Sequence, residues 1–271
     1  DVDAAEANLS QCDVILMQLE VPLQVVYHTI AMAARHGITT VYHLSAVLSA
    51  RGEADPARTW DVNTRGLLHV LDAARDGLIR QVFFPSTIAV FGPNVPQNAT
   101  PDDAVLNPTT VYGMSKAAGE NWCAYYHQRW GVDVRSLRYP GVIGHQSLPG
   151  GGTTDYAVDI FHQALATGRF ECFLEAGQAL PMIYMDDAIR ATIELMQAPM
   201  ERITRRTSYN LQGISFTPAE IAAEAEAGRL QQEQLLREQQ RWQHLQEQMR
   251  PAPEARLGEA AAPLAAFSLS Q

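Results

Sequence analysis

The sequence is poor in cysteine, contains no long apolar run and carries no basic stretch. Its three cysteines, Cys12, Cys123 and Cys172, are scattered, which argues against a disulfide framework and suits a reducing compartment. No apolar run approaches the roughly 20 residues that a membrane-spanning helix needs. With 20 Lys and Arg against 30 Asp and Glu, the formal net charge is −10, so neither nucleic acid nor a membrane is an expected partner.

Two further signals are missing. The first eleven residues, DVDAAEANLSQ, lack the basic and apolar parts of a signal peptide. We therefore expect a cytoplasmic protein, or a protein of the mitochondrial matrix if the source is eukaryotic. The eight histidines and three cysteines show no metal-ligand spacing, so no metal site is expected.

What is present is an alternation of strand-like and helix-like segments. Residues 13–20, DVILMQLE, favour a strand, 23–37 favour a helix that ends at Gly37, and 38–50 favour a second strand that runs into a loop. This strand–helix–strand order predicts a parallel sheet. Later strands are predicted at 79–92, 132–144 and 207–213, and the first of these is expected to run into a loop at Pro85. Later helices are predicted at 63–77, 110–131 and 156–168. Residues 181–199 are predicted to form a short strand followed by a helix.

The C-terminal part changes in composition. A helix is predicted to begin with Thr217 as its cap and Pro218 in its first turn. Residues 229–250 are rich in Gln, Glu and Arg, and their two weak heptads fit a solvated helix better than a coiled coil. Residues 251–271 have the composition of a disordered end.

Chemistry is first suggested by the segment NPTTVYGMSKAAGE, in which Tyr112 precedes Lys116 by one helical turn. Residues four apart share a helix face, so an ammonium there would favour the phenolate and lower the pKa of the tyrosine. A phenolate in position can remove a proton from a substrate hydroxyl. Alone, this spacing is a weak signal, because it also arises by chance on ordinary helices.

The neighbouring strands strengthen the interpretation. Ser86 and Thr87 follow the strand of 79–84, and Tyr139, Pro140 and Gly141 end the next strand. Ligands of open parallel sheets bind beyond the carboxyl ends of the strands. Hydroxyl donors, a Tyr–Lys pair and a Pro-Gly loop on successive units together fit the short-chain dehydrogenase/reductase pattern.

Longer motifs resemble one branch of that superfamily. FPSTIAVFGP, TVYGMSK, VRSLRYPGVI and PGGGTTDYAVDIFH are similar to segments of L-threonine 3-dehydrogenases of the extended short-chain family. The resemblance covers about 41–224. Residues 1–40 instead resemble an internal fragment of ribokinase-type sugar kinases, and 225–271 resemble neither. The expected domains are thus a strand–helix segment of foreign origin (1–40), a dehydrogenase core (41–224) and a helical and disordered tail (225–271).

The resemblance implies a role for individual residues. Tyr112 would be the general base, tuned by Lys116, with Ser86 as a further catalytic residue. The amino-acid substrate would contact hydroxyls, the phenol and one carboxylate, and NAD would be held by residues of the central region. The implied substrate-binding residues are Ser49, Ser86, Thr87, Tyr112, Thr153, Thr154 and Asp155, and the implied cofactor-binding residues are Asn63, Lys116, Tyr139, Pro140 and Gly141.

The implied reaction is the oxidation of the 3-hydroxyl of L-threonine to 2-amino-3-oxobutanoate by NAD. The implied fold is a Rossmann-like parallel α/β sheet, truncated at its N-terminus, with a small incomplete substrate lobe. A homodimer through 63–77 and 110–130 is a further expectation. Dinucleotide enzymes need a glycine-rich turn after the first strand, and the first glycine here is Gly37, so we expect an impaired cofactor site. An inactive fragment that acts only by association, and a nucleotide-sugar epimerase or reductase, remain open.

Overall fold

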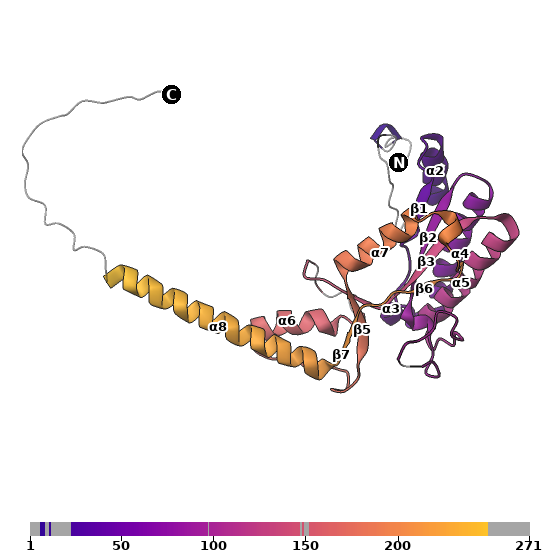
Figure 1. Ribbon diagram of the computed structural model, residues 1–271. Helices are drawn as coiled ribbons and strands as arrows, with labels where there is room; N and C mark the ends of the chain where they lie inside the picture. Colours follow the sequence, from indigo (N-terminus) through magenta and orange to yellow (C-terminus); the bar gives the residue numbers. More distant parts are fainter. Residues whose placement is uncertain are drawn as a thin grey trace, which may run out of the picture. The chain divides into compact units, whose positions relative to one another are not determined.

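The computed structural model describes residues 6–8, 11, 23–96, 98–146, 148 and 152–248. It shows an α/β fold built on a parallel sheet (Figure 1), which confirms the predicted fold class. The chain forms two compact units, residues 1–223 and 224–271, and the candidate site lies wholly in the first. The strand predicted at 13–20 and the disordered end predicted at 251–271 lie outside the described residues, and the foreign origin of residues 1–40 stays a prediction.

The larger sheet has four parallel strands in the order β1-β2-β3-β6. These strands are β1 (Thr40–Tyr42), β2 (Gln81–Thr87), β3 (Asp133–Tyr139) and β6 (Tyr209–Asn210). In their register, Ser86 pairs with Arg138 and Thr87 pairs with Tyr139. Since all four strands run in one direction, their carboxyl ends meet at a single edge, where Ser86, Thr87 and Tyr139 lie.

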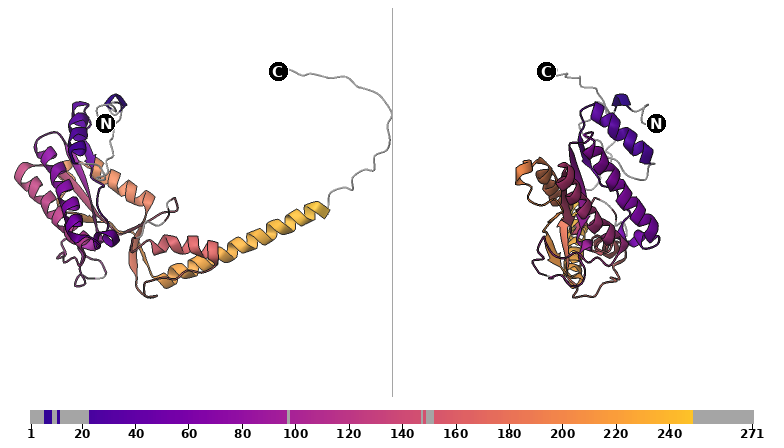
Figure 2. Two further views of the ribbon diagram at one scale, coloured as in Figure 1. Left: turned by 180° about the vertical axis from the view of Figure 1, so that it is seen from behind. Right: turned by 90° about the vertical axis from the view of Figure 1, so that its right-hand side faces the viewer.

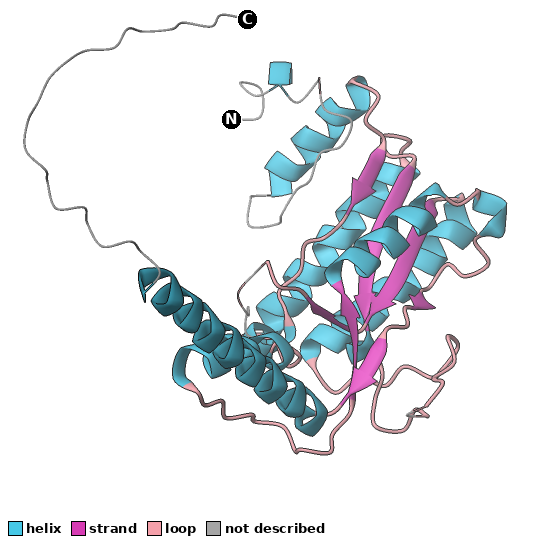
Figure 3. Cartoon of the chain, turned by 60° about the vertical axis from the view of Figure 1, so that its left-hand side comes forward, coloured by secondary structure: helices cyan, strands magenta, loops and turns pink. Residues whose placement is uncertain are grey.

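Helices cover both faces of this sheet (Figures 1 and 3). On one face, apolar side chains of α2 (Leu23–Arg35), α4 (Pro56–Arg75) and α5 (Val111–Trp130) form a core with Val82 and Phe84. On the other, α7 (Met185–Gln197) packs against Phe83 and Leu137. Successive residues of β2 thus point to opposite faces, as a strand requires.

A second, three-stranded sheet forms the small lobe, visible from two sides in Figure 2. Its order is β4-β5-β7, with β4 (Gly141–Ile143) parallel to β5 (Leu180–Tyr184) and β7 (Ile214–Phe216) antiparallel to it. Only Pro140 separates β3 from β4, so the chain passes from one sheet to the other at this proline. The remaining elements are α3 (Ser49–Gly52), α6 (Tyr156–Thr167), α8 (Pro218–Gln248) and the 3₁₀ helices Ile88–Val90 and Met200–Arg202.

Helix ends follow local signals in the sequence. Thr110 caps α5 by accepting a hydrogen bond from Gly113 N at 3.0 Å, and Gly131 ends that helix with a φ of 72°. Arg135 on β3 donates to three carbonyl oxygens at the end of α7, at 2.6–3.0 Å. A charged side chain therefore replaces the missing helical donors at that end.

Two sequence-based boundaries were wrong. The helix predicted at 63–77 begins earlier, because Asp55 caps it and Pro56 occupies its first turn. The predicted loop at Pro85 is still strand, since β2 continues to Thr87. The pairing of β1 with β2 ends at Phe83, so Pro85 lies beyond the last residue of β2 that pairs with β1. The missing N–H of Pro85 therefore removes no hydrogen bond between these two strands. Within the described ranges, no helix is long and apolar enough to span a membrane.

Candidate active site

The candidate site lies where β2 and β3 end and α5 begins. Thr87 and Tyr139 are the last residues of their strands and lie opposite each other in the sheet. Tyr112 belongs to the first turn of α5, and Lys116 follows one turn later. The fold thus brings together hydroxyl and amine groups that are separated by up to 52 positions in the sequence.

Tyr112 is half-buried and its side chain shares a hydrogen bond with that of Thr87. Burial raises the pKa of Tyr112, and the bond to Thr87 lowers it by less. The expected lowering of the Tyr112 pKa by Lys116 is therefore wrong for the free protein. Lys116 Nζ lies 5.9 Å from the centroid of the phenol ring and donates its hydrogen bond to the Pro85 carbonyl oxygen.

Lys116 is the only lysine in the chain, and it is 3% exposed. Its ammonium donates to the carbonyl oxygen of Pro85 at 2.7 Å and lies 4.7 Å from the centroid of the Phe84 ring. Burial lowers the pKa of Lys116 to about 8. The lysine is thus anchored to the end of β2, beside the tyrosine that it was predicted to tune.

Ser86 and Thr87 point to different partners. The Ser86 hydroxyl is buried and donates to the carboxylate of Glu120 at 2.5 Å. Thr87 supplies the hydroxyl that reaches Tyr112. The catalytic and substrate-binding role of Ser86 stays a prediction, but in this conformation its oxygen faces a buried carboxylate.

Asn63 on α4 connects two parts of the fold. Its amide oxygen accepts from Val47 N at 2.8 Å, and its amide nitrogen donates to Val47 O at 3.1 Å and to the Ser115 hydroxyl at 3.0 Å. The same hydroxyl donates to Tyr112 O at 2.8 Å. Asn63 therefore fixes the segment after β1 to the first turn of α5, whereas its predicted contact with a cofactor is untested.

The segment from Tyr139 to Gly141 holds both lobes. The Tyr139 hydroxyl forms a short hydrogen bond with Thr192 of α7, and burial raises the Tyr139 pKa. Gly141 has no room for a side chain, because an added Cβ would meet Met182 and would lie 2.6 Å from Thr154 Cβ. Gly141 therefore brings the threonine-rich loop against β4, while its predicted place beside nicotinamide is untested.

The remaining predicted substrate residues lie on two segments. Ser49 opens the short helix α3 and is half-buried. On the loop before α6, Thr153 is exposed and Thr154 is half-buried. The Asp155 carboxylate accepts from Gly152 N at 2.8 Å and so closes a turn in that loop.

His43 was not recognised from the sequence. It directly follows β1, is 4% exposed and stacks on Phe84 with ring centroids 6.4 Å apart. Its Nε2 has no hydrogen-bond partner among the described residues. Burial, and secondarily the charge of Lys116, lower the pKa of His43 to about 3, so the ring is neutral. Its position at a strand end was the signal that could have drawn attention to it.

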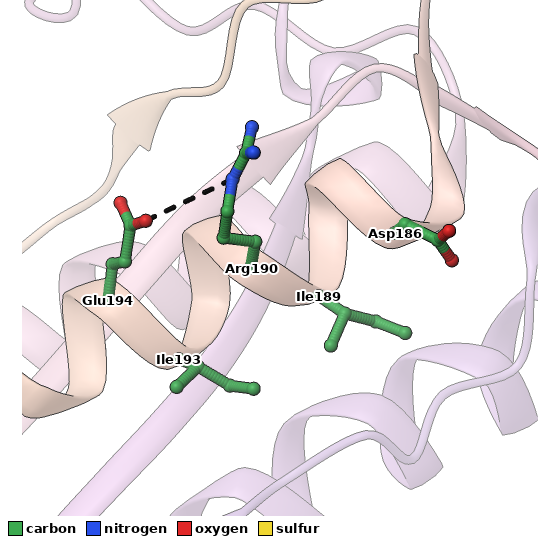
Figure 4. A pocket seen from close by; sticks show the side chains of 5 residues that line it. All are labelled: Asp186, Ile189, Arg190, Ile193 and Glu194. Carbon is green, nitrogen blue, oxygen red and sulfur yellow. Dashed lines mark ion pairs between the residues drawn. The ribbon is translucent and has the colours of Figure 1, made fainter.

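Two hollows lie near the lobes. One of about 140 Å³ is lined by Asp155 together with Tyr184, whose hydroxyl lies 2.5 Å from His145 Nδ1. Another, of about 380 Å³, follows α7 (Figure 4) and is lined by Ile189 and Ile193 beside Arg190, which lies 3.9 Å from Glu194. The second hollow contains none of the predicted site residues. Among the residues that are described, no three His, Cys, Asp or Glu side chains gather as metal ligands.

Comparison with known proteins assigns the family. Residues 19–211, more than half of the chain, match the NAD dependent epimerase/dehydratase family. The chain belongs to this family. A UDP-glucose 4-epimerase of Thermotoga maritima in that fold, 22% identical with a TM-score of 0.65, supports the fold alone.

More similar relatives carry one activity in their names. The mitochondrial L-threonine 3-dehydrogenase of Bos taurus is 52% identical over 187 residues, 69% of this chain and 50% of the relative. A GalE-like L-threonine dehydrogenase from Cupriavidus necator is 57% identical with a TM-score of 0.70, covering 73% of this chain and 64% of that one. A partial consensus L-threonine 3-dehydrogenase is 49% identical with a TM-score of 0.72, covering 82% and 75%.

These similarities confirm the family resemblance that the motifs indicated. The chain spans about half the length of the curated relatives it matches.

Proposed function

We propose that the core of this chain is an NAD-dependent dehydrogenase site for L-threonine. The observation that carries the proposal is the hydrogen bond between the side chains of Thr87 and Tyr112, with Lys116 anchored one turn away. The named activity of relatives at 49–57% identity supports the same substrate. In this reaction, the alcohol at the threonine Cβ becomes a ketone.

The residues act on a proton at one oxygen atom. The substrate hydroxyl would bind between Thr87 and Tyr112, and its proton would pass to the Tyr112 oxygen. The Lys116 ammonium, within 5.9 Å of the ring centroid, would stabilise the negative charge of the phenolate. Lys116 and Tyr139 would hold NAD, which would supply the two-electron oxidation as the hydride acceptor, with NADH and one proton as the balancing products. The proposed substrate contacts of Thr153, Thr154 and Asp155 would hold the amino and carboxylate groups.

The residues fit NAD at one end of the cofactor. Tyr139 and His43 lie at strand ends, and Lys116 of α5 is anchored there through Pro85. In the part of the chain that the structure describes, His43 Nε2 has no hydrogen-bond partner, and we place the nicotinamide ribose in this region as part of the proposal. At the pyrophosphate end, the sequence contains no glycine before Gly37, which already follows α2. We therefore propose weak or impaired NAD binding by this chain alone.

Calorimetric titration with NAD, with and without L-threonine, tests the proposal directly. Saturation at or below millimolar NAD, tightened by L-threonine, is the expected result. Absence of heat at both conditions would overturn the enzymatic proposal and leave the second candidate, an inactive member of the family that acts by association. The lack of an early glycine-rich turn is the observation that favours that candidate.

We also propose a homodimer through α4 and α5. Three aromatic residues on α5, Trp122, Tyr125 and Trp130, are 38–47% exposed and contact one another or Tyr126 edge to face. Exposed aromatic groups of this kind are typical of interfaces. One relative, at 41% identity, is described as a monomeric L-threonine 3-dehydrogenase, so the state needs measurement. A monomeric mass in sedimentation at high concentration would contradict this proposal.

A further inference from the structure

A buried ion pair lies directly behind the candidate active site. Glu120 is fully buried on α5 and Arg138 on β3 is 2% exposed. Arg138 Nε donates to one carboxylate oxygen at 2.9 Å and its terminal nitrogen donates to the other at 2.7 Å. This is a two-point contact, which fixes orientation as well as distance.

Each member of this pair is adjacent to a residue of the site. Glu120 continues the four-residue spacing of Tyr112 and Lys116, so all three share one face of α5. The Ser86 hydroxyl, which binds Glu120 at 2.5 Å, immediately precedes Thr87. Arg138 immediately precedes Tyr139, the register partner of Thr87.

The network also reaches the outer elements of the lobe. Arg138 donates to Asp102 O at 2.8 Å and to Asn210 Oδ1 at 3.1 Å. Asn210 N in turn donates to the Asp102 carboxylate at 2.7 Å. These bonds fix both the segment around Asp102 and the strand β6 to β3.

Stability alone does not account for a buried ion pair. Two charges lose their hydration on burial, and apolar residues of similar volume often stabilise a fold as well or better. What charged, forked groups provide is direction, because they satisfy one another in a single relative position. Here, the bonds of Glu120 to Ser86 and Arg138 connect α5 to both β2 and β3.

We propose that Glu120 and Arg138 are positioning residues that hold Tyr112 and Lys116 opposite Thr87. The inference deepens the proposed dehydrogenase function and names no new substrate. Neither residue contacts the reacting atoms in this proposal. They act on the site by fixing three neighbours of the reacting groups. These neighbours are Ser86, the face of α5 that carries Tyr112 and Lys116, and the position in β3 before Tyr139.

The decisive variant replaces the pair by apolar residues, Glu120→Leu together with Arg138→Met. Because the charges leave together, we expect a melting temperature near or above that of the native chain. Lys116 is nevertheless expected to lose its fixed place beside Pro85. Since Lys116 is the only lysine, incorporation of [13C]lysine gives one set of signals whose pH titration reports its pKa.

We expect the measured Lys116 pKa to rise by about one unit, equal to a tenfold change in its ionisation equilibrium. The direction of the change in the Lys116 pKa separates a direct effect of the lost charges from a change in the exposure of Lys116. Removing the pair's positive member Arg138 would raise the pKa and removing its negative member Glu120 would lower it, so the loss of both leaves little direct electrostatic change. A rise in the double variant therefore reports greater exposure of Lys116.

Two controls complete the test. Asp133→Asn breaks another ion pair on β3, in which Asp133 lies 2.9 Å from Arg135, and should lower stability without moving the Lys116 pKa. Ser86→Ala removes one hydroxyl and keeps the ion pair, and should raise the Lys116 pKa by less than the double variant. This readout needs no turnover, so it remains decisive if NAD binding proves absent.

A folded double variant with an unchanged Lys116 pKa would overturn the inference and leave the pair a purely structural one. If the double variant does not fold, Ser86→Ala decides alone, with an unchanged Lys116 pKa again overturning the inference. Where turnover is measurable, the double variant should also lose about 100-fold in kcat with a smaller change in KM, because misplacement of catalytic groups acts on the chemical step.

Discussion

The ammonium of Lys116 donates a hydrogen bond to the carbonyl oxygen of Pro85, 2.7 Å away, inside a largely apolar surrounding. The same proline lies in a strand where a loop was predicted, and its neighbours Ser86 and Thr87 carry the hydroxyls of the site. This bond joins the helix with the Tyr–Lys pair to the strand with the hydroxyls, and the bond from Ser86 to Glu120 joins the same two elements one turn further along α5.

Tyr112→Phe removes the proposed proton acceptor and keeps the ring. We expect at least a loss of about 100-fold in kcat for L-threonine oxidation, since a positioned general base contributes about 10²–10⁴-fold. NADH formation is the measurement, under conditions where NAD binding has been established. Tyr125→Phe on the same helix is the control and should leave kcat within about twofold; comparable losses in both variants would contradict the assignment.

Lys116→Met should change how stability depends on pH. The folded pKa of about 8 lies below the ordinary 10.5, so from pH 8 to 10.5 the unfolded chain binds the additional proton. Stability from this group therefore rises with pH in that window. Between pH 7 and 9 the native chain should gain about 1 kcal/mol relative to Lys116→Met.

Urea unfolding of both chains at several pH values measures this difference. Arg129→Met, an exposed cation on the same helix, should show no such relative change. Parallel stability curves for the native chain and Lys116→Met would mean that the lysine is not desolvated in solution.

His43→Phe should stabilise the protein, most of all in mild acid. The folded pKa of about 3 lies below the ordinary 6.5, so the unfolded chain takes up a proton first and stability is lost as pH falls from 6.5 toward 3. That loss is about 2 kcal/mol between pH 7 and 5 in the native chain and absent in the variant. Thermal melts at both pH values measure it, with the exposed His162→Asn as control. A variant that is less stable at both pH values would show that Nε2 has a stabilising partner.

Gly141→Ala should destabilise the junction between the two lobes. The added methyl group would lie 2.6 Å from Thr154 Cβ and would also overlap Met182, and overpacking of this kind costs about 1–3 kcal/mol. Gly144→Ala is a matched control, because the nearest atom there, Met185 Cβ, is 3.5 Å away. Equal melting temperatures of the two variants would mean that the Thr154 loop moves aside freely.

Much of the arrangement could be read from local patterns. The cap Thr110 and the left-handed Gly131 bound α5, and Gly37 follows α2 as predicted. The Tyr112–Lys116 spacing and the strand-end hydroxyls indicated one edge of a parallel sheet. These signals depend on residues close together in sequence, and the motif resemblance to L-threonine 3-dehydrogenases extended them to the family that the comparisons confirm.

Other features depend on contacts over long sequence separations. Nothing local distinguishes Ser86 from Thr87, yet one hydroxyl binds a buried carboxylate and the other reaches Tyr112. The direction of the Tyr112 pKa also came out opposite to the prediction, because burial outweighs a lysine that is itself desolvated.

The sequence by itself determined which groups the chain carries and the order of its strands and helices, because periodicity and caps act within a few residues. Only the tertiary structure decided which of these groups meet. Ser86 and Arg138 become register partners, and Glu120 closes on both, only when α5 packs on the sheet. Burial follows from the same packing, and burial sets the protonation of Lys116 and His43.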